Sequence, residues 1–409
     1  METLIGHRMG YYNRAPFMVN ADKHTRIVAE TGTGKSVLMG DMMIEDMRAG
    51  RGLLAIDPNG TLVRRALRYV PKHRIHHVRW FDPLSDRPLG LTVLRGNTRE
   101  EKLKRADQYI DTISKVFENG WGGLSDYIVR NLLYTIIEVE PEPTPAHLYL
   151  ALMSEEYRDS LFGRATSENF RLFKNKFDEE WKASDRENRS AAPMNKSDIP
   201  IASWIIRDVL CQANGMDLGE EMANGSIILC DLDKGRIGPK ACSLFGRFLL
   251  QEVLFAGSAR EEGSKPFSLY IDELHNFVDV DALETVLQEL RKRNVRAVGA
   301  DQEARYIPRA NFTTTIVGAV DPVSAEELAA NFAKPDLAEF LTKIPAFHWE
   351  VQTKDENGVK SDPTFVKGRT PLKRIGTEYP AARAIQYSEE NYGTLREKVE
   401  REINRLLAA

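Results

Sequence analysis

Short apolar runs alternate with stretches of helical spacing along much of the chain. In the first hundred residues the strand-like runs are 26–28, 53–56 and 77–80, separated by helix-like stretches at 37–47 and 61–69. The strand-like pattern returns at 227–230, 267–271, 295–298 and 314–317. Strands that alternate with helices predict βαβ units around a mainly parallel sheet.

Between about Thr98 and Asp217 strand-like runs are nearly absent, and the spacing is helical. The apolar positions at helical spacing are Leu103, Ala106, Ile110, Ile113, Val116 and Phe117, then Ile128, Leu132, Leu133, Ile136 and Ile137. We therefore predict one α/β domain that is interrupted by an all-α insertion. The expected segments are 1–97 (first half of the α/β domain), 98–222 (insertion), 223–345 (second half) and 346–409 (C-terminal part).

The C-terminal part predicts a strand pair followed by a helix. Residues 348–352 and 363–366 have strand character, and the turn-rich segment 354–358 joins them. From about 392 to 407 the apolar residues fall on one helical face: Val399, Ile403, Leu406 and Leu407. We expect this face to pack against the rest of the chain, with a contact between subunits as the alternative.

The composition is that of an ordinary globular protein. The 409 residues are 42% hydrophobic, and 56 basic against 60 acidic residues give a net charge of −4. No apolar run approaches the roughly 18 residues of a membrane-spanning helix, and the first residues lack a signal-peptide pattern. We therefore expect a soluble, cytoplasmic protein. Any contact with DNA must be local, because a general DNA coat would be basic overall.

The cysteines and histidines do not predict a zinc or redox site. Cys211, Cys230 and Cys242 are odd in number and lack the close pairs of a zinc site. They indicate buried free thiols in a reducing compartment. The histidines within 73–77 have no cysteine or carboxylate at ligand spacing, which argues against a metal there.

One segment fits the pattern of a phosphate-binding loop. Its residues are Ala29, Glu30, Thr31, Gly32, Thr33, Gly34, Lys35 and Ser36, with alanine in place of the usual first glycine. The glycines let successive backbone N–H groups curl around phosphates at the start of the next helix, and Val37 in its first turn is counted with the nucleotide-binding residues. In such a loop Lys35 bridges the β- and γ-phosphates of ATP and Ser36 ligates Mg²⁺. A glycine-rich turn of purely structural role is the alternative.

A second motif is the apolar run 267–271 followed by Asp272 and Glu273. At such a strand end the first carboxylate helps to hold Mg²⁺, and the second polarises the water that attacks the γ-phosphate. We therefore assign Asp272 to the metal and Glu273 to the role of catalytic base; a cap for the turn at 274–276 is the alternative for Asp272. Gln302, after the next strand-like run, is the candidate sensor of the γ-phosphate or the water, with a surface glutamine as the alternative.

Together these motifs resemble the HerA/FtsK superfamily of DNA-pumping ATPases, and within it the TraG-like coupling ATPases of conjugative type IV secretion. The resemblance runs from about residue 14 to the end and rests on the stretches 24–36, 55–60, 80–83, 121–131, 226–238, 270–277 and 391–393. Coupling ATPases typically carry histidine where this chain has Asn59. They also begin with transmembrane helices, and HerA begins with a β-barrel. This chain starts about 24 residues before the loop, so we expect a stripped-down motor that partners recruit, including to a membrane.

The resemblance implies a RecA-like P-loop ATPase fold with ATP and Mg²⁺ as cofactors. It implies a homo-oligomeric ring, a hexamer by analogy, with ATP at the subunit interfaces and DNA in the central channel. Arg291 stands where the family has an Arg-Lys pair, which makes it the candidate arginine finger supplied to the neighbouring subunit. A solvated basic helix end that complements the helix dipole is the alternative.

The function that follows is that of an ATP-hydrolysing DNA translocase of the conjugative coupling type. Two alternatives use the same motor for viral genome packaging or for nuclease-linked DNA processing or defence. A third is a nucleotide-gated assembly module that does not translocate. The partners implied are DNA, then a relaxase, a membrane or secretion-channel component, a capsid protein or a nuclease.

Two basic stretches are candidates for contact with DNA phosphates, which requires charge but no particular sequence. The first contains Arg64, Arg65, Arg68, Lys72, His73, Arg74, His76, His77 and Arg79, and a merely solvated face is its alternative. The second is Lys234-Gly235-Arg236, which has the character of a mobile, glycine-containing loop.

Overall fold

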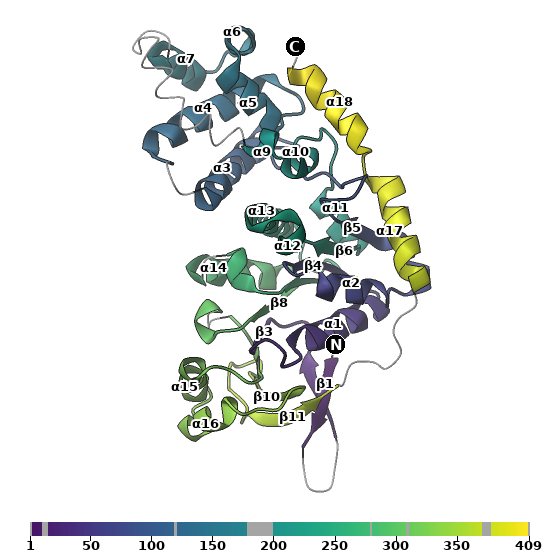
Figure 1. The fold of residues 1–409 in the computed structure, drawn as a ribbon. Helices are drawn as coiled ribbons and strands as arrows, with labels where there is room; N and C mark the ends of the chain where they lie inside the picture. The colour runs from purple at the N-terminus through teal and green to yellow at the C-terminus, as the bar shows by residue number, and fades with distance from the viewer. Residues whose placement is uncertain are drawn as a thin grey trace. The chain divides into compact units, whose positions relative to one another are not determined.

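The computed structural model describes residues 2–9, 15–117, 121–177, 199–278, 280–307, 311–369 and 378–407. Contacts within the chain define two compact units, which are described one at a time (Figure 1). The sheet unit comprises Met1–Phe81, Leu218–Arg236 and Val253–Ser388, and the helical unit comprises Asp82–Asp217, Ile237–Glu252 and Glu389–Ala409. Within the described ranges no helix is both long and apolar enough to cross a membrane.

A mixed sheet forms the centre of the sheet unit, with the strand order β2-β1-β11-β10-β9-β3-β8-β7-β4-β6-β5 among the described residues. The strands are β1 (Glu2–Arg8), β2 (Pro16–Asn20), β3 (Thr25–Val28), β4 (Gly52–Asp57), β5 (Val78–Phe81), β6 (Ile227–Asp231), β7 (Phe267–Ile271), β8 (Val295–Asp301), β9 (Thr314–Val317), β10 (His348–Thr353) and β11 (Thr364–Gly368). From β9 to β5 all neighbours pair in parallel. The predicted α/β fold with a mainly parallel sheet is confirmed, and each predicted run coincides with a strand to within one residue at its start.

Helices cover both faces of the parallel part of the sheet. All residues of β4 and β8 are buried, and successive side chains of a strand point to opposite faces. The helices assigned wholly or mainly to this unit are α1 (Lys35–Arg48), α2 (Thr61–Leu67), α11 (Leu218–Asn224), α12 (Lys234–Ile237), α14 (Val280–Lys292), α15 (Pro322–Asn331), α16 (Ala338–Leu341) and α17 (Glu378–Tyr392), with 3₁₀ turns η1 (Lys72–His77), η3 (Leu274–Asn276), η4 (Ala304–Tyr306) and η5 (Pro335–Leu337). Such double coverage explains why these strands are continuous apolar runs rather than alternating ones.

The sheet continues past β9 with antiparallel strands. The predicted hairpin is confirmed as β10 and β11, and β11 pairs with β1, which pairs with β2. The strands β1 and β2 were not predicted from the sequence. A Cβ atom on Gly6 would lie only 2.2 Å from the carbonyl oxygen of Lys367, so the close approach of β1 to β11 requires glycine there.

The helical unit contains α3 (Arg99–Val116), α4 (Gly123–Val139), α5 (Pro145–Met153), α6 (Glu155–Arg164), α7 (Glu168–Asn175), α9 (Ile199–Ala202), α10 (Trp204–Leu210) and α18 (Arg396–Leu407), while α13 (Pro239–Ser258) is divided between the two units. A capping box of Thr98 and Glu101 begins α3. The apolar face of α18 packs within this unit, where Val399 and Ile403 are buried with Ala146 and Cys211. The predicted packing of the terminal helix is therefore confirmed, as are the buried free thiols.

A buried ion pair joins α1 to the sheet. The Arg296 guanidinium on β8 donates to Asp46 Oδ2 at 2.5 Å and to the Tyr270 hydroxyl at 2.5 Å, and all three side chains are almost completely buried. Tyr270 also donates to Asp46 at 2.7 Å. Charges taken out of water contribute to stability only while they remain paired.

Asp46→Ala should lower the free energy of unfolding by about 3–5 kcal/mol, because it leaves the Arg296 charge buried without its partner. Urea denaturation of wild type and variant measures this difference. The matched control is Asp362→Asn, which removes an exposed ion pair with Lys334 and should change stability by less than about 1 kcal/mol. Equal effects of the two substitutions would show that the Asp46 pair does not anchor α1.

Candidate functional site

The candidate site lies at the carboxyl ends of three parallel strands. The loop 29–34 follows β3, Asp272 and Glu273 follow β7, and Gln302 follows β8, which lies between the other two strands. Ligands of open α/β sheets bind outside the carboxyl ends of the strands. The strand order therefore brings the phosphate loop next to the other two motifs, which lie more than 200 residues further along the sequence.

Two glycines give the backbone of the loop after β3 a left-handed conformation. Gly32 and Gly34 have φ values of 85° and 104°, which are costly for any residue with a Cβ atom. The Thr33 hydroxyl donates to the carbonyl of Glu30 at 2.7 Å, and the Glu30 N–H donates to the carbonyl of Ala319 at 2.8 Å. These contacts fix the loop without using the N–H groups of the glycines.

Where α1 begins, the structure is suited to an anion. Gly34 is the N-cap and offers no side-chain acceptor, and the first turn contains no acidic residue. The first N–H groups of a helix have no partner within the helix, and the helix dipole adds positive potential there. Phosphate groups fit this environment.

The Lys35 ammonium group and the Ser36 hydroxyl both contact the buried carboxylate of Asp272. Lys35 Nζ lies 3.8 Å from Asp272 Oδ1, and the Ser36 hydroxyl donates to Asp272 Oδ2 at 3.3 Å. Burial raises the pKa of Asp272 above its ordinary value, although Lys35 opposes the shift. A bound divalent cation would offset this cost.

Mg²⁺ fits these residues by the chemistry of their donors. It prefers oxygen and keeps water and substrate phosphates as ligands, so one or two protein oxygens suffice. Ser36 and Asp272 would supply them. Larger clusters of His, Cys, Asp or Glu that could hold a metal do not occur in the described part of the chain. At the turn η3, the His275 N–H donates to Asp301 Oδ2 at 3.0 Å, whereas Asp272 Oδ1 accepts the N–H of Glu273, the N-cap residue, at 3.1 Å.

Glu273 is held at both carboxylate oxygens. Asn59 Nδ2 donates to Oε1 at 3.0 Å, and Lys234 Nζ donates to Oε2 at 2.8 Å. Burial raises the pKa of Glu273, but the hydrogen bonds from Lys234 and Asn59 and the charges of Lys234 and Lys35 outweigh it, so the pKa lies below the ordinary value. The residue also has a φ of 47°, an unusual conformation for glutamate that often marks a functional position.

Asn59 reaches Glu273 from the end of the neighbouring strand β4. The buried Asp57 carboxylate accepts N–H bonds from Asn59 at 2.9 Å and from Leu62 at 2.7 Å, which fixes the turn. Burial raises the pKa of Asp57 to about 6. The hydrogen bond from the Asn59 N–H lowers this pKa, and the nearby negative charge of Asp272 raises it further. From the sequence, Asn59 was recognised only as a departure from a family pattern, and its contact with Glu273 was not predicted.

One pocket of about 290 Å³ contains most of the predicted residues. It is lined by Glu30, Thr31, Gly32, Gly34, Lys35, Ser36, Val37, Asn59, Asp272, Glu273, Gln302 and Phe347. Ala29 and Thr33 do not line it: Ala29 is fully buried where β3 ends, and the Thr33 hydroxyl turns to Glu30. Phe347 is a lining residue that the sequence analysis did not single out.

Arg291 lies away from this pocket. It is exposed on the last turn of α14, just before β8 begins, whereas Gln302 follows the other end of the same strand. Seven strand residues span about 20 Å. Arg291 therefore cannot reach the pocket of its own chain.

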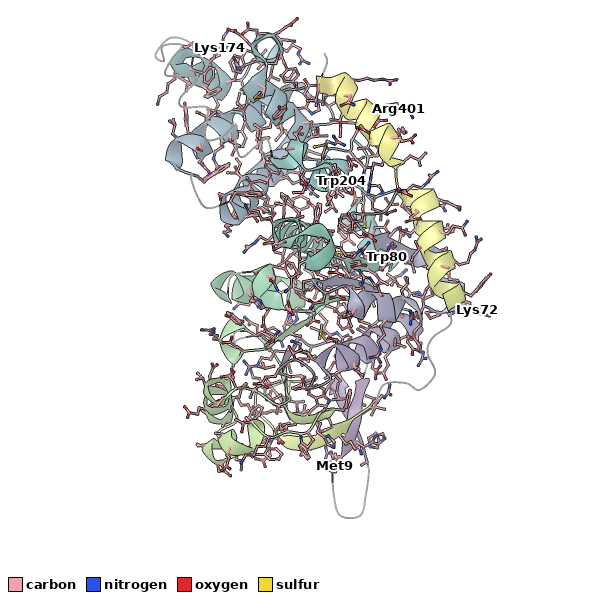
Figure 2. All side chains as sticks on the ribbon, in the orientation of Figure 1. Met9, Lys72, Trp80, Lys174, Trp204 and Arg401 are labelled. Carbon is pink, nitrogen blue, oxygen red and sulfur yellow. The ribbon has the colours of Figure 1, made fainter. Side chains whose placement is uncertain are left out.

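Four of the nine basic residues in the stretch 64–79, namely Arg64, Arg65, Arg74 and Arg79, are bound inside the sheet unit. Arg74 is buried and donates to three backbone carbonyls, and Arg79 is buried against Glu221 at 2.7 Å. The Arg64 guanidinium binds Asp231 and Asp233. The expectation of a solvated or DNA-facing surface is wrong for Arg74 and Arg79. In Figure 2 Lys72 lies at the surface, and the exposed members of the stretch are Arg68, Lys72, His73 and His76.

The second basic stretch is not a mobile loop. Residues 234–237 form the helical turn α12, and the Asp233 carboxylate accepts the Gly235 N–H at 3.0 Å. Lys234 binds Glu273, and Arg236 binds Asp231 at 3.1 Å. The partner of Lys234 is 39 residues away and that of Arg236 five, and the pattern of basic residues alone reveals neither ion pair.

A parallel sheet with a phosphate loop after one strand and an acidic pair two strands away defines a P-loop NTPase fold. No family model and no curated protein sequence matches the chain. Solved structures do match, and they show that the chain has the fold of the two proteins described next.

Two of these structures are the most informative. The plasmid coupling protein TrwB in complex with ADP and Mg²⁺ has a TM-score of 0.62 and 16% identity, covering 93% of this chain and 97% of that one. VirB4 of Thermoanaerobacter pseudethanolicus has a TM-score of 0.57 and 13% identity, with 90% and 96% covered. A further structure, the bacterial conjugative coupling protein TrwBdeltaN70 in its unbound form, has a TM-score of 0.59 and 16% identity over 90% of this chain and 89% of that one.

Ser36→Ala should weaken the binding of ADP in the presence of Mg²⁺ by at least about tenfold, because it would remove one of the two side-chain oxygens assigned to the metal. With EDTA the affinities of variant and wild type should agree. Calorimetric titration measures both. The control is Ser264→Ala, whose hydroxyl donates to the carbonyl of Glu261 and does not line the pocket. A loss of equal size with and without Mg²⁺ would argue against the metal assignment.

Proposed function

We propose that this protein is an ATP-hydrolysing motor of the conjugative coupling type that moves DNA, or a DNA–protein complex, through a ring of identical subunits. The observation that carries the proposal is the pocket in which Lys35, Ser36, Asp272 and Glu273 converge. The fold adds support, because TrwB is described as a plasmid coupling protein and was crystallised with ADP and Mg²⁺.

In this proposal each residue has a task in phosphoryl transfer. Lys35 and the N–H groups at the start of α1 bind and orient the phosphates. Glu273 orients the attacking water and accepts its proton. Gln302, at the end of the strand between the other two motifs, monitors the γ-phosphate. Mg²⁺, held by Ser36 and Asp272, would neutralise charge on the β- and γ-phosphates.

The ring is part of the proposal. Arg291 lies about one strand length from the pocket of its own chain, which favours its action on a neighbouring subunit. The proposal also includes a hexamer with DNA in its channel, a cytoplasmic location and recruitment to a membrane by partners. The exposed basic residues of the stretch 64–79 are the remaining candidates for contact with DNA phosphates.

Glu273→Gln should reduce ATP turnover by about 100-fold or more while ATP still binds, because the variant cannot accept a proton. Wild-type turnover should rise with DNA and increase cooperatively with protein concentration. Phosphate release measured with single- and double-stranded DNA tests both expectations. Negligible turnover combined with ATP-dependent assembly would instead support a nucleotide-gated assembly module.

Mixing two inactive variants tests the role of Arg291. Arg291→Ala retains its own pocket, and Glu273→Gln retains its arginine, so mixed rings contain some complete interfaces. We expect turnover of the mixture to exceed the sum of the separate proteins. If Arg291→Ala alone hydrolyses ATP as wild type does, the residue is not the arginine finger.

Lys234→Ala should shift the acid limb of the pH dependence of kcat/KM to higher pH. Glu273 acts as a base only when ionised, and the variant loses the hydrogen bond and charge that lower its pKa, so activity is lost at a higher pH on acidification. Lys234→Arg, which keeps the charge, should restore much of the wild-type limb. Identical acid limbs in all three proteins would show that Lys234 does not act on Glu273.

A further inference from the structure

Phe347 is the aromatic member of the residues that line the pocket. Its side chain is half-buried, whereas Trp349, two residues further on, is 1% exposed and belongs to the core. Phe347 thus presents part of its ring to the pocket instead of burying it completely. Aromatic faces are favourable surfaces for sugar and base rings.

The backbone holds Phe347 in a conformation that suits glycine better. Its φ is 60°, in the left-handed region. Two hydrogen bonds of 2.8 Å fix it there, from the Phe347 N–H to the carbonyl of Thr33 and from the Gly368 N–H to the carbonyl of Phe347. Strain of this kind costs free energy that glycine would avoid, so the position uses the ring despite the cost.

The ring lies directly against the phosphate loop. A Cβ atom built on Gly34 would be 2.6 Å from Cδ1 of Phe347, so the ring occupies the space beside the glycine Cα. Together with the bond to Thr33, this contact attaches the segment before β10 to the loop. A nucleotide whose phosphates bind in the loop would therefore lie near the ring of Phe347.

The strand order indicates which end of a nucleotide faces Phe347. Residues that would act on the γ-phosphate follow β7 and β8, on one side of β3. Phe347 directly precedes β10, which lies on the other side of β3, beyond β9. With its terminal phosphate toward Glu273, a nucleotide extends its sugar and base toward β9 and β10.

We propose that the ring of Phe347 is the surface on which the sugar and base of the bound nucleotide rest. The inference depends on the proposed function, in that the pocket must bind a nucleotide. Stacking does not distinguish one base from another, because every base has a π face. Phe347 therefore increases the affinity for ligands that carry a nucleoside, and it does so equally for adenine and guanine nucleotides.

The test compares ligands with and without a nucleoside. ADP, GDP and inorganic pyrophosphate are titrated with Mg²⁺ into the full chain and into Phe347→Ala. We expect the affinities for ADP and GDP to fall by about tenfold or more and that for pyrophosphate to stay the same. Phe347→Tyr keeps the ring and should bind all three as wild type does. Phe340→Ala is a second control, since Phe340 packs edge-on against Phe365 and does not line the pocket.

Two results would overturn the inference. Unchanged affinity of Phe347→Ala for ADP would mean that the nucleoside does not touch the ring. Equal losses for ADP and pyrophosphate would mean that the ring only supports the loop through Gly34. If wild type binds neither ligand, the proposed nucleotide site itself is wrong, and the comparison with pyrophosphate separates this failure from the first two.

Discussion

The buried carboxylate of Asp272 is the point on which the site depends. It would be costly in the interior without partners, and its partners are the amine of Lys35 and the hydroxyl of Ser36, both from the phosphate loop. These contacts are possible because only one strand, β8, lies between β3 and β7 in the sheet. The sheet register, the loop conformation and the electrostatics of the pocket are thus linked through one carboxylate.

The charges around Glu273 extend this arrangement outward. Lys234, on the turn α12, reaches the carboxylate of Glu273, and its neighbour Arg236 binds Asp231 at the end of β6. Asp231 also binds Arg64 on α2. The ends of β4, β6 and β7 therefore carry one connected set of ion pairs and hydrogen bonds beside the pocket. A substitution of Lys234 on α12 would therefore change the pKa of Glu273, the candidate base.

The sequence predicted the features that depend on local pattern. The parallel strands were recognisable because strands buried on both faces are continuous apolar runs, and the loop because glycines and Lys35-Ser36 occur at fixed spacing. Features that depend on distant partners were missed. β1 exists through its pairing with β11, and the roles of Lys234 and Arg79 follow from carboxylates 39 and 142 residues away. A row of basic residues does not reveal whether its charges face solvent or are paired internally.

The most direct test of this account is an experimental structure of the full chain with a non-hydrolysable ATP analogue and Mg²⁺. We expect phosphates in the loop 29–36, the metal next to Ser36 and Asp272, and the terminal phosphate on the side of Glu273 and Gln302. A nucleotide bound outside this pocket, or the opposite orientation within it, would contradict the account.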